Sequence, residues 1–398
     1  MRHTVLHIIV LSVCGLFDST AQITFQKVVE SGEYLTGNSI ALTFDGGYIL
    51  TGNVWSNDGE SSNVSLTKID KQGNVIWSKK YGGEKRDLGL KVTQTSDSGY
   101  AIAGSTDSFS MYGDLYLVKT DSEGNEQWSK TFGSLGDDVG NSGISTSDGG
   151  FALIGAIDKS TAGRSRDIFL VKADSSGNTQ WVKEFGTTEY EQGEYIQQTF
   201  DEGFIIGGFA DSKNPKQRNI VLIKTDRLGN KMWTRLYKGE GVRILTKVIQ
   251  LKDSGYAICG DIHDKNKVPP RSDALVIRTD SLGSVIWEKY FGINDNVDCN
   301  SIVQDTEGNL VITGKIGTYR DRKSFFVYLM SISLEGDQLW VNTYGGDDFN
   351  ASSDLQQCPD GGFIIVGETK SSGDLRTKAL VIKTDESGAC KKFEVNTD

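Results

Sequence analysis

Six tryptophans recur along this chain of 398 residues at nearly equal spacing. Successive tryptophans are separated by 51, 53, 52, 54 and 53 residues. Recurrence at this length indicates a repeat architecture, in which each structural unit packs against its neighbours along the chain. The spacing therefore constrains the fold more than any other feature of the sequence. The recurring residues are Trp77, Trp128, Trp181, Trp233, Trp287 and Trp340.

Each repeat contains short segments rich in β-branched and aromatic residues, which predict strands. The first strand, GLKVTQT (89–95), leads through a tight turn carrying an acid into the second, YAIAG (100–104). The third, DLYLVKTD (114–121), is reversed by an Asp-x-x-Gly-Asn turn into the fourth, EQWSKTF (126–132). High glycine content, 47 residues, and only 4 prolines agree with many strands joined by tight turns.

Sets of the first three strands begin near residues 37, 89, 140, 193, 245, 299 and 352. Four-stranded units repeated seven times predict an all-β fold, a seven-bladed β-propeller of four-stranded antiparallel blades spanning residues 22–398. The last repeat lacks its tryptophan, whereas ITFQKVV (23–29) is a fourth strand without a repeat of its own. We therefore expect the N-terminal strand, about 22–30, to complete blade seven. Residues 389–395 are the alternative.

The repeated turn and the strand before it carry recurrent polar residues. Asp121 is expected to bond the turn's own backbone, and Gly124 to supply a positive φ. Trp128 is then expected to pack where one sheet meets the next. A basic residue precedes the turn aspartate by two positions in all repeats but one, which predicts an ion pair or a shared hydrogen-bond network between the two. These basic residues are Lys68, Lys119, Lys172, Lys224, Arg278 and Lys383.

Two patterns in the repeat resemble a known family. Asp-Gly-Gly-Tyr/Phe followed by a hydrophobic strand ending in glycine, and then TDxxGNxxWxKxYGG, resemble the exported β-propeller repeats abundant in Bacteroidota. The resemblance covers about residues 22–384 and implies a propeller in the cell envelope or outside the cell, without implying an activity. No C-terminal sorting domain of the kind that many such proteins carry is recognised, so both release and retention in the periplasm remain open.

The first 21 residues have the pattern of a secretory signal peptide. Arg2 precedes an apolar run from Val5 to Phe17, and Ser19 and Ala21 form a small-residue cleavage site. We expect cleavage near Ala21 and a secreted or periplasmic protein; a buried N-terminal strand is the alternative. The run is too short to span a membrane, and no later stretch approaches ~18 apolar residues, so no membrane span is expected.

Charge and histidine content narrow the classes of function. A formal net charge of −11 repels phosphate backbones, so nucleic acid is not an expected partner. Only His263 remains after signal removal, which argues against a histidine-based triad and paired-histidine zinc sites. No metal, no cofactor and a monomeric state are expected.

Carboxylates are the remaining side chains that could support catalysis. The loops that lead into the first strands are expected at one mouth of the central channel, where two acids could work as in a glycosidase. A carbohydrate-active enzyme is therefore the alternative function. The candidate acids are Asp87, Asp138, Glu191 and Asp348.

Four cysteines remain after signal removal and permit disulfides in an exported protein. Strand directions favour Cys358 with Cys390 and Cys259 with Cys299. The alternative is four small thiols in the core.

The longest and most variable loops follow the second strands and lie on one face of the predicted ring. Variable loops on a rigid scaffold are the usual place for binding. The predicted function is thus a non-catalytic binding scaffold for a protein or glycan ligand, with an acidic ligand favoured by the local basic residues. The candidate binding face holds Trp55, Tyr112, His263, Tyr319, Arg320 and Arg322.

Overall fold

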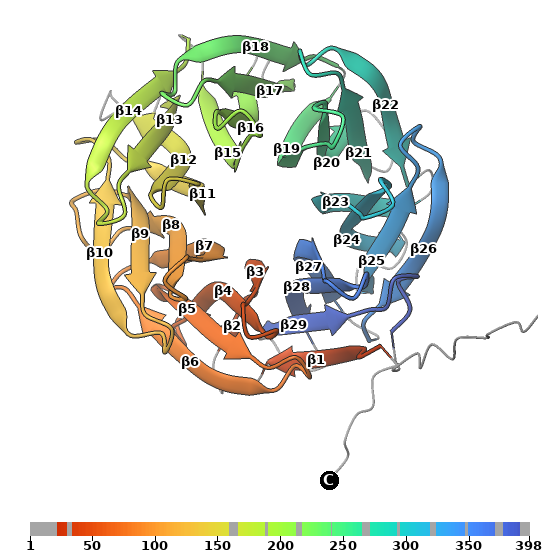
Figure 1. The fold of residues 1–398 in the computed structure, drawn as a ribbon, viewed down its shortest axis with the longest axis horizontal. Coiled ribbons are helices and arrows are strands. Elements are labelled where there is room, and N and C mark those ends of the chain that lie inside the picture. Colours follow the sequence, from red (N-terminus) through yellow and green to blue (C-terminus); the bar gives the residue numbers. More distant parts are fainter. Residues whose placement is uncertain are drawn as a thin grey trace, which may run out of the picture.

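The computed structural model shows a ring of β-sheets (Figure 1). Every regular element in the described part of the chain is a strand. The structure describes residues 22–29, 34–158, 166–187, 190–211, 217–239, 241–264, 271–292, 295–318, 324–346, 349–370 and 377–390.

Strands that follow one another along the chain pair as antiparallel neighbours. One sheet holds β2 (Tyr34–Leu35), β3 (Ser39–Leu42), β4 (Tyr48–Trp55), β5 (Ser62–Ile69) and β6 (Val75–Tyr81). The next sets are β7 (Asp87–Gln94), β8 (Tyr100–Thr106), β9 (Asp114–Thr120) and β10 (Glu126–Phe132), then β11 (Val139–Ser145), β12 (Phe151–Asp158), β13 (Arg166–Ala173) and β14 (Thr179–Phe185).

The pattern continues with β15 (Glu191–Gln198), β16 (Phe204–Asp211), β17 (Arg218–Thr225) and β18 (Lys231–Tyr237), and with β19 (Val242–Gln250), β20 (Tyr256–Asp264), β21 (Arg271–Thr279) and β22 (Val285–Phe291). It ends with β23 (Asp295–Gln304), β24 (Leu310–Thr318), β25 (Phe325–Ile332) and β26 (Gln338–Tyr344), and with β27 (Phe349–Gln357), β28 (Phe363–Lys370) and β29 (Lys378–Lys383).

The N-terminal strand β1 (Phe25–Val29) pairs antiparallel with β29, from Phe25 opposite Lys383 to Val29 opposite Ala379. The predicted place of this strand beside the last set is therefore confirmed. The ring of Phe25 lies against Gly73 in a turn of the first sheet, so that Phe25 stands where other sheets use a tryptophan. Figure 1 shows β1 beside β29 on the outside of the ring.

The first strand of each set lies at the centre of the ring and the fourth at the rim (Figure 1). We call β3, β7, β11, β15, β19, β23 and β27 the inner strands. The apolar core lies between neighbouring sheets: one cluster joins Leu117 of β9 to Phe151 of β12, and another joins Val381 of β29 to Leu50 of β4. Each sheet therefore buries both faces, which explains the nearly continuous hydrophobic runs of the second and third strands.

A bulge interrupts most inner strands and explains the glycine that recurs within each second strand, two or more residues before its end. The pairing of β7 with β8 shifts between Gly89 and Lys91. At this shift a Cβ on Gly104 would lie 1.8 Å from the carbonyl oxygen of Leu88, so only glycine fits. The same close approach recurs at Gly155, Gly208, Gly260, Gly314 and Gly367.

The recurrent tryptophans join neighbouring sheets, as predicted, although each remains half-buried. Trp128 on β10 lies edge-on to Phe151 of the next sheet, with ring centroids 5.7 Å apart. A Cβ on Gly177, in the turn of that next sheet, would lie 2.7 Å from the Trp128 ring. Gly177 also has a φ of +77°. The indole therefore packs beneath the glycine turn of its neighbour.

The turn itself is built as predicted. Oδ1 of Asp121 accepts hydrogen bonds from the backbone N–H groups of Glu123 at 3.0 Å and Asn125 at 2.7 Å. Gly124 has a φ of +76°. These bonds satisfy the reversing backbone. The side-chain amide of Asn125, which donates to Asp121 Oδ2 at 2.9 Å, and then the backbone N–H of Asn125 hold the pKa of Asp121 below its usual value.

The predicted partner of the recurrent lysines is wrong. Lys119 does not pair with Asp121, two positions on, but with Asp97 in the tight turn after the inner strand, at 2.8 Å. The lysine side chain is buried and also donates to the carbonyl of Thr120, so it ties two turns of one sheet together. Residues two apart share one side of a strand, but the turn aspartate already uses its carboxylate on its own backbone. The other pairs are Lys68–Asp45, Lys172–Asp148, Lys224–Asp201, Arg278–Asp253 and Lys383–Asp360.

Candidate functional site

Side chains from different sheets meet in the central channel. Each inner strand contributes the residue that directly follows its bulge, or the equivalent position in β3, and we call this set the channel ring. Its members differ in chemistry although they occupy one position of the repeat. They are Ser39, Lys91, Ser142, Tyr195, Lys247, Ser301 and Asp354.

Asp354 is the centre of the channel ring. Its carboxylate accepts hydrogen bonds from the ammonium groups of Lys91 at 2.7 Å and Lys247 at 3.1 Å. It also accepts from the hydroxyls of Ser39 at 2.8 Å and Ser301 at 3.1 Å. One carboxylate thus connects four other inner strands, and it is only 4% exposed.

The charges of this group are maintained by one another. Burial alone would raise the pKa of Asp354, but the positive charges of Lys247 and Lys91 lower it far below its usual value. Burial would lower the pKa of Lys247, but the charge of Asp354 raises it above its usual value. Two ammonium groups therefore face one carboxylate, and the channel ring carries one excess positive charge.

The residue before the ring position links neighbouring inner strands. The side-chain amide of Asn38 donates to the carbonyl of Gly89 at 2.8 Å, and that of Asn141 donates to the carbonyl of Gly193 at 2.8 Å. Thr246 and Asn300 make the same bond to Cys299 and Ser352 at 2.7 Å. This belt fixes the bulges and so fixes the ring side chains beside them.

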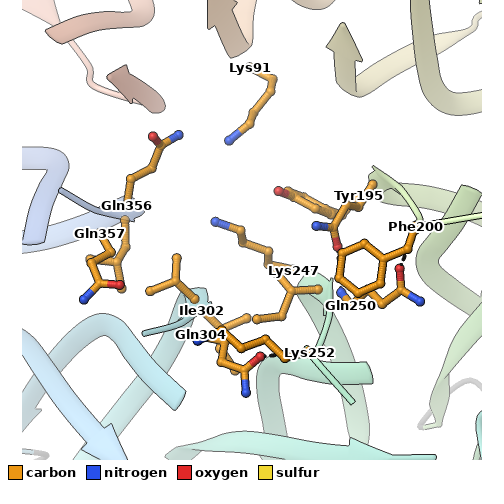
Figure 2. A pocket seen from close by; sticks show the side chains of 14 residues that line it. Lys91, Tyr195, Phe200, Lys247, Gln250, Lys252, Ile302, Gln304, Gln356 and Gln357 are labelled. Atoms are coloured by element: carbon orange, nitrogen blue, oxygen red, sulfur yellow. Dashed lines mark hydrogen bonds between the residues drawn. The ribbon is translucent and has the colours of Figure 1, made fainter. Parts of the chain in front are cut away.

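A cavity of about 460 Å³ is lined by three members of the channel ring, Lys91, Tyr195 and Lys247 (Figure 2). Figure 2 shows Lys91 and Lys247 pointing into the open space, with Tyr195 on one side and Gln356 on the other. The walls come from the ends of β15, β19, β23 and β27, with β7 contributing Lys91. Phe200, which follows β15, lines the cavity and is 69% exposed.

Glutamines at the ends of the inner strands join one sheet to another across the cavity wall. Oε1 of Gln250 accepts from the backbone N–H of Phe200 at 2.8 Å, and Oε1 of Gln197 accepts from that of Gln250 at 2.7 Å. Oε1 of Gln304 accepts from Lys252 N–H at 2.9 Å, and Figure 2 draws this bond. The cavity wall is thus held in place by bonds between sheets.

The cavity lies toward the face opposite to the one predicted for binding. Its lining residues belong to the ends of the inner strands, which lead into the tight turns rather than the long loops. Of the predicted binding residues, Trp55 ends β4, Tyr112 lies between β8 and β9, and His263 lies on β20. The structure therefore spreads these three over three sheets. Tyr319, Arg320 and Arg322 lie outside the described residues.

The predicted channel-mouth acids are bound by their own loops. Asp87 is fully buried and accepts from Gly83 N–H at 2.6 Å, from Ser108 Oγ at 2.8 Å and from Thr106. Asp138 accepts from Asp158 N–H at 2.7 Å, and burial raises its pKa. Glu191 accepts from Thr187. Each acid stabilises the loop that enters its inner strand. Asp348 lies outside the described residues.

A second buried charged group lies between the sheet of β19–β22 and that of β23–β26. Asp261 accepts a hydrogen bond from the backbone N–H of Cys299 at 2.6 Å. Burial, and then the negative charge of Asp298, raise the pKa of Asp261 well above its usual value. Asp298 is paired with Lys315 at 2.8 Å.

All four cysteines are free thiols in the structure. Cys259 and Cys299 lie in one apolar cluster, and Thr246 Oγ1 contacts both Cys259 Sγ and the Cys299 carbonyl, so their predicted pairing agrees with their proximity. Cys358 packs in the cluster that joins β28 to β4, whereas Cys390 packs against the cluster of β25 and β28. The expectation that Cys358 and Cys390 share one face of the sheet is therefore wrong, because different interfaces hold them.

Within the described residues, no group of three or more histidine, cysteine, aspartate or glutamate side chains is arranged to hold a metal ion. The same part of the chain contains no helix long and apolar enough to cross a bilayer.

Comparison with known proteins supports the architecture. No protein-family model matches the sequence, and a search of curated proteins finds no match. Among solved structures, puromycin hydrolase is similar with a TM-score of 0.57 and 10% sequence identity over 88% of this chain and 52% of the other. The polysaccharide lyase Uly1 is similar with a TM-score of 0.54 and 10% identity over 88% and 90% of the two chains.

A third similar structure is BBS1N, solved in complex with ARL6DN, with a TM-score of 0.51 and 11% identity over 91% and 96% of the two chains. The present chain spans about half the length of puromycin hydrolase. These neighbours are propeller-type folds, and they differ in activity. The chain therefore has a propeller-like all-β fold, and its function has to be argued from its own residues.

Proposed function

We propose that this chain is a secreted or periplasmic seven-bladed β-propeller that acts as a non-catalytic binding protein, with its ligand in the central channel. The observation that carries the proposal is the cavity of about 460 Å³ above the channel ring, whose volume lies in the ~300–1,000 Å³ range of small-molecule sites. Its charged side chains are fixed by bonds between sheets, which is how binding sites are preorganised.

Several features support the finer parts of this proposal. The count of seven rests on the repeat frame and on the sets of four strands, with β1 as the fourth strand of the set that begins at β27. The location outside the cytoplasm rests on the signal-peptide pattern of residues 1–21 and on the family resemblance.

The alternative, a carbohydrate-active enzyme, has weaker support. Catalytic acids need access to substrate and to water, whereas Asp87 and Asp138 are fully buried and accept from the loop N–H groups of Gly83 and Ser134. The enzymes among the similar structures share only the fold with this chain. Release of reducing ends from a polysaccharide panel by the purified protein would support the enzyme over the binding protein.

The decisive experiment compares one variant in each candidate site. Gln356→Trp fills the cavity, and Tyr112→Ala removes an exposed aromatic from the long-loop face. Ligands are first found by thermal-shift screening of neutral and acidic sugars, carboxylic acids and amino acids. Loss of binding in Gln356→Trp, with Tyr112→Ala unchanged and both variants folded by circular dichroism, supports the channel. The reverse pattern would place the ligand on the long-loop face and overturn the channel proposal.

A further inference from the structure

We infer that the cavity binds an acidic saccharide, a uronate, whose carboxylate contacts the Lys91 ammonium and the Tyr195 hydroxyl. This inference rests on the proposed binding function and names the chemistry of its ligand. It is carried by the balance of hydrogen-bond donors and acceptors on the cavity wall.

Open donors at the inner end of the cavity come from the channel ring. The Lys91 ammonium has three N–H groups but makes one hydrogen bond among the described residues, to Asp354. The Tyr195 hydroxyl makes none within that part of the chain, while the ammonium of Lys91 lies 5.8 Å from its ring centroid. Both groups line the cavity. A carboxylate placed there would accept from a cation and a phenol together.

Three of the glutamines on the cavity wall already use their acceptor oxygen. Oε1 of Gln197, Gln250 and Gln356 each accepts a backbone N–H from another turn or strand, at 2.7, 2.8 and 3.4 Å. These bonds fix which way each amide points and leave its NH₂ group without a bonded partner among the described residues. The cavity therefore offers donors and requires a ligand rich in acceptor oxygens.

The charge of the cavity wall also favours an anionic ligand. No aspartate or glutamate is among the lining residues, whereas Lys91, Lys247 and Lys252 are. Asp354 neutralises one of the two ammonium groups that it contacts, and the chain as a whole carries a formal charge of −11. A local positive site in an acidic protein favours one anionic group on the ligand.

Shape and apolar contacts distinguish a sugar from other anions. The exposed ring of Phe200 offers a flat apolar surface at the opening, suited to the face of a pyranose ring. The three glutamine amides would donate to the hydroxyl and ring oxygens of a sugar. A fatty acid has no such oxygens, and an inorganic anion is too small to reach all three amides. A uronate satisfies the ammonium, the amides and the aromatic ring at once.

The test uses isothermal titration with two matched pairs, cellobiouronic acid against cellobiose and digalacturonic acid against galactobiose. We expect at least one acid to bind at least tenfold more tightly than its neutral partner. Lys91→Met should abolish that preference, and Tyr195→Phe should reduce it without removing the ion pair to Asp354. Lys71→Met, on an exposed turn at the rim, makes the same charge change and should leave binding unaltered.

Three results would overturn the proposal that the ligand is a uronate. The neutral sugars could bind as tightly as the acids, the preference could survive in both Lys91→Met and Tyr195→Phe, or neither acid could give saturable binding. Sodium sulfate forms a separate arm: if it binds alone, with the same dependence on Lys91, and the acids bind no more tightly than sulfate, the ligand is a simple anion. If the neutral sugars bind the protein as tightly as the acids but do not bind Gln356→Trp, the channel proposal stands while the uronate fails.

Discussion

The ammonium of Lys91 lies 2.7 Å from the carboxylate of Asp354, although 263 residues separate them in the sequence. Lys247 reaches the same carboxylate from a third inner strand. Strands with no shared hydrogen-bond ladder are thereby tied together across the channel. This contact stabilises the folded ring and is also part of the candidate site.

Removing the carboxylate should be costly. Asp354→Asn leaves the buried ammonium of Lys247 and the partly buried ammonium of Lys91 without their counter-charge, so we expect a loss of about 3–5 kcal/mol in the free energy of unfolding. Urea denaturation measures it. Adding Lys247→Met to Asp354→Asn removes one of the two charges and should recover part of the loss. An Asp354→Asn protein as stable as the wild type would show that the triad contributes nothing.

The indole between sheets should matter more than an exposed aromatic. Trp128→Ala removes a ring packed on Gly177 and Phe151, and because the ring is half-buried we expect a loss of about 2–4 kcal/mol. Tyr112→Ala is the control and should change stability by less than about 0.5 kcal/mol. Equal effects of the two substitutions in thermal unfolding would contradict this role of the tryptophan.

The two kinds of glycine should respond differently to alanine. Gly104→Ala would place a methyl group 1.8 Å from a carbonyl oxygen, so the bulge must move, at a cost of more than about 2 kcal/mol. Gly46→Ala has open space around the new methyl and meets only the strain of a φ of +80°, about 1–2 kcal/mol. Denaturant midpoints for both variants test the order, and a smaller effect at Gly104 would refute it.

Stability should fall as the pH rises through neutrality because of Glu194. Burial raises the pKa of this carboxyl to about 7, although Gln192 and Arg218 favour the charged form. A raised pKa means that the folded state holds the proton, so the contribution is present below about pH 4.5 and is lost as the pH passes 7. Glu194→Gln should gain stability relative to the wild type between pH 5 and pH 8. Parallel pH profiles of the two proteins would exclude this origin.

The pairs of cysteines should differ in their response to oxidation. Cys259 and Cys299 are in contact and should form a disulfide under mild oxidants that reach the interface, whereas Cys358 and Cys390 are held in different apolar clusters and should not. Peptide mapping without reductant distinguishes the pairs. A bridge between Cys358 and Cys390 in the folded protein would contradict the arrangement described above.

Much of the architecture could be predicted because each sequence pattern occurs in several repeats, so that each repeat supports the same inference. Trp128 and Gly124 recur in equivalent places, so one argument about packing and turns applied to the whole chain. The partner of Lys119 was missed because it lies across a sheet, at Asp97, and short-range spacing suggested the nearer Asp121.

The channel ring was missed because its residues differ from one repeat to the next. Its position is constant in the repeat, but the residue changes from Ser142 to Tyr195 to Lys247, so no motif marks it. Comparing one repeat position across all the repeats, and asking where the chemistry varies, would have pointed to these residues. The convergence of Ser39, Lys91, Lys247 and Ser301 on Asp354 depends on the curvature of the ring, which the sequence pattern does not specify.

The seam between β1 and β29 has a consequence for biogenesis. A growing polypeptide displays Phe25 and its strand from the outset, yet the pairing edge they need is completed only when Lys383 has been made. Until then β1 lacks the strand with which it pairs in the folded protein. Completion of the fold therefore depends on the last sheet to be synthesised. A chain that ended before β29 would leave unpaired strand edges at both ends of the ring, and such edges favour aggregation.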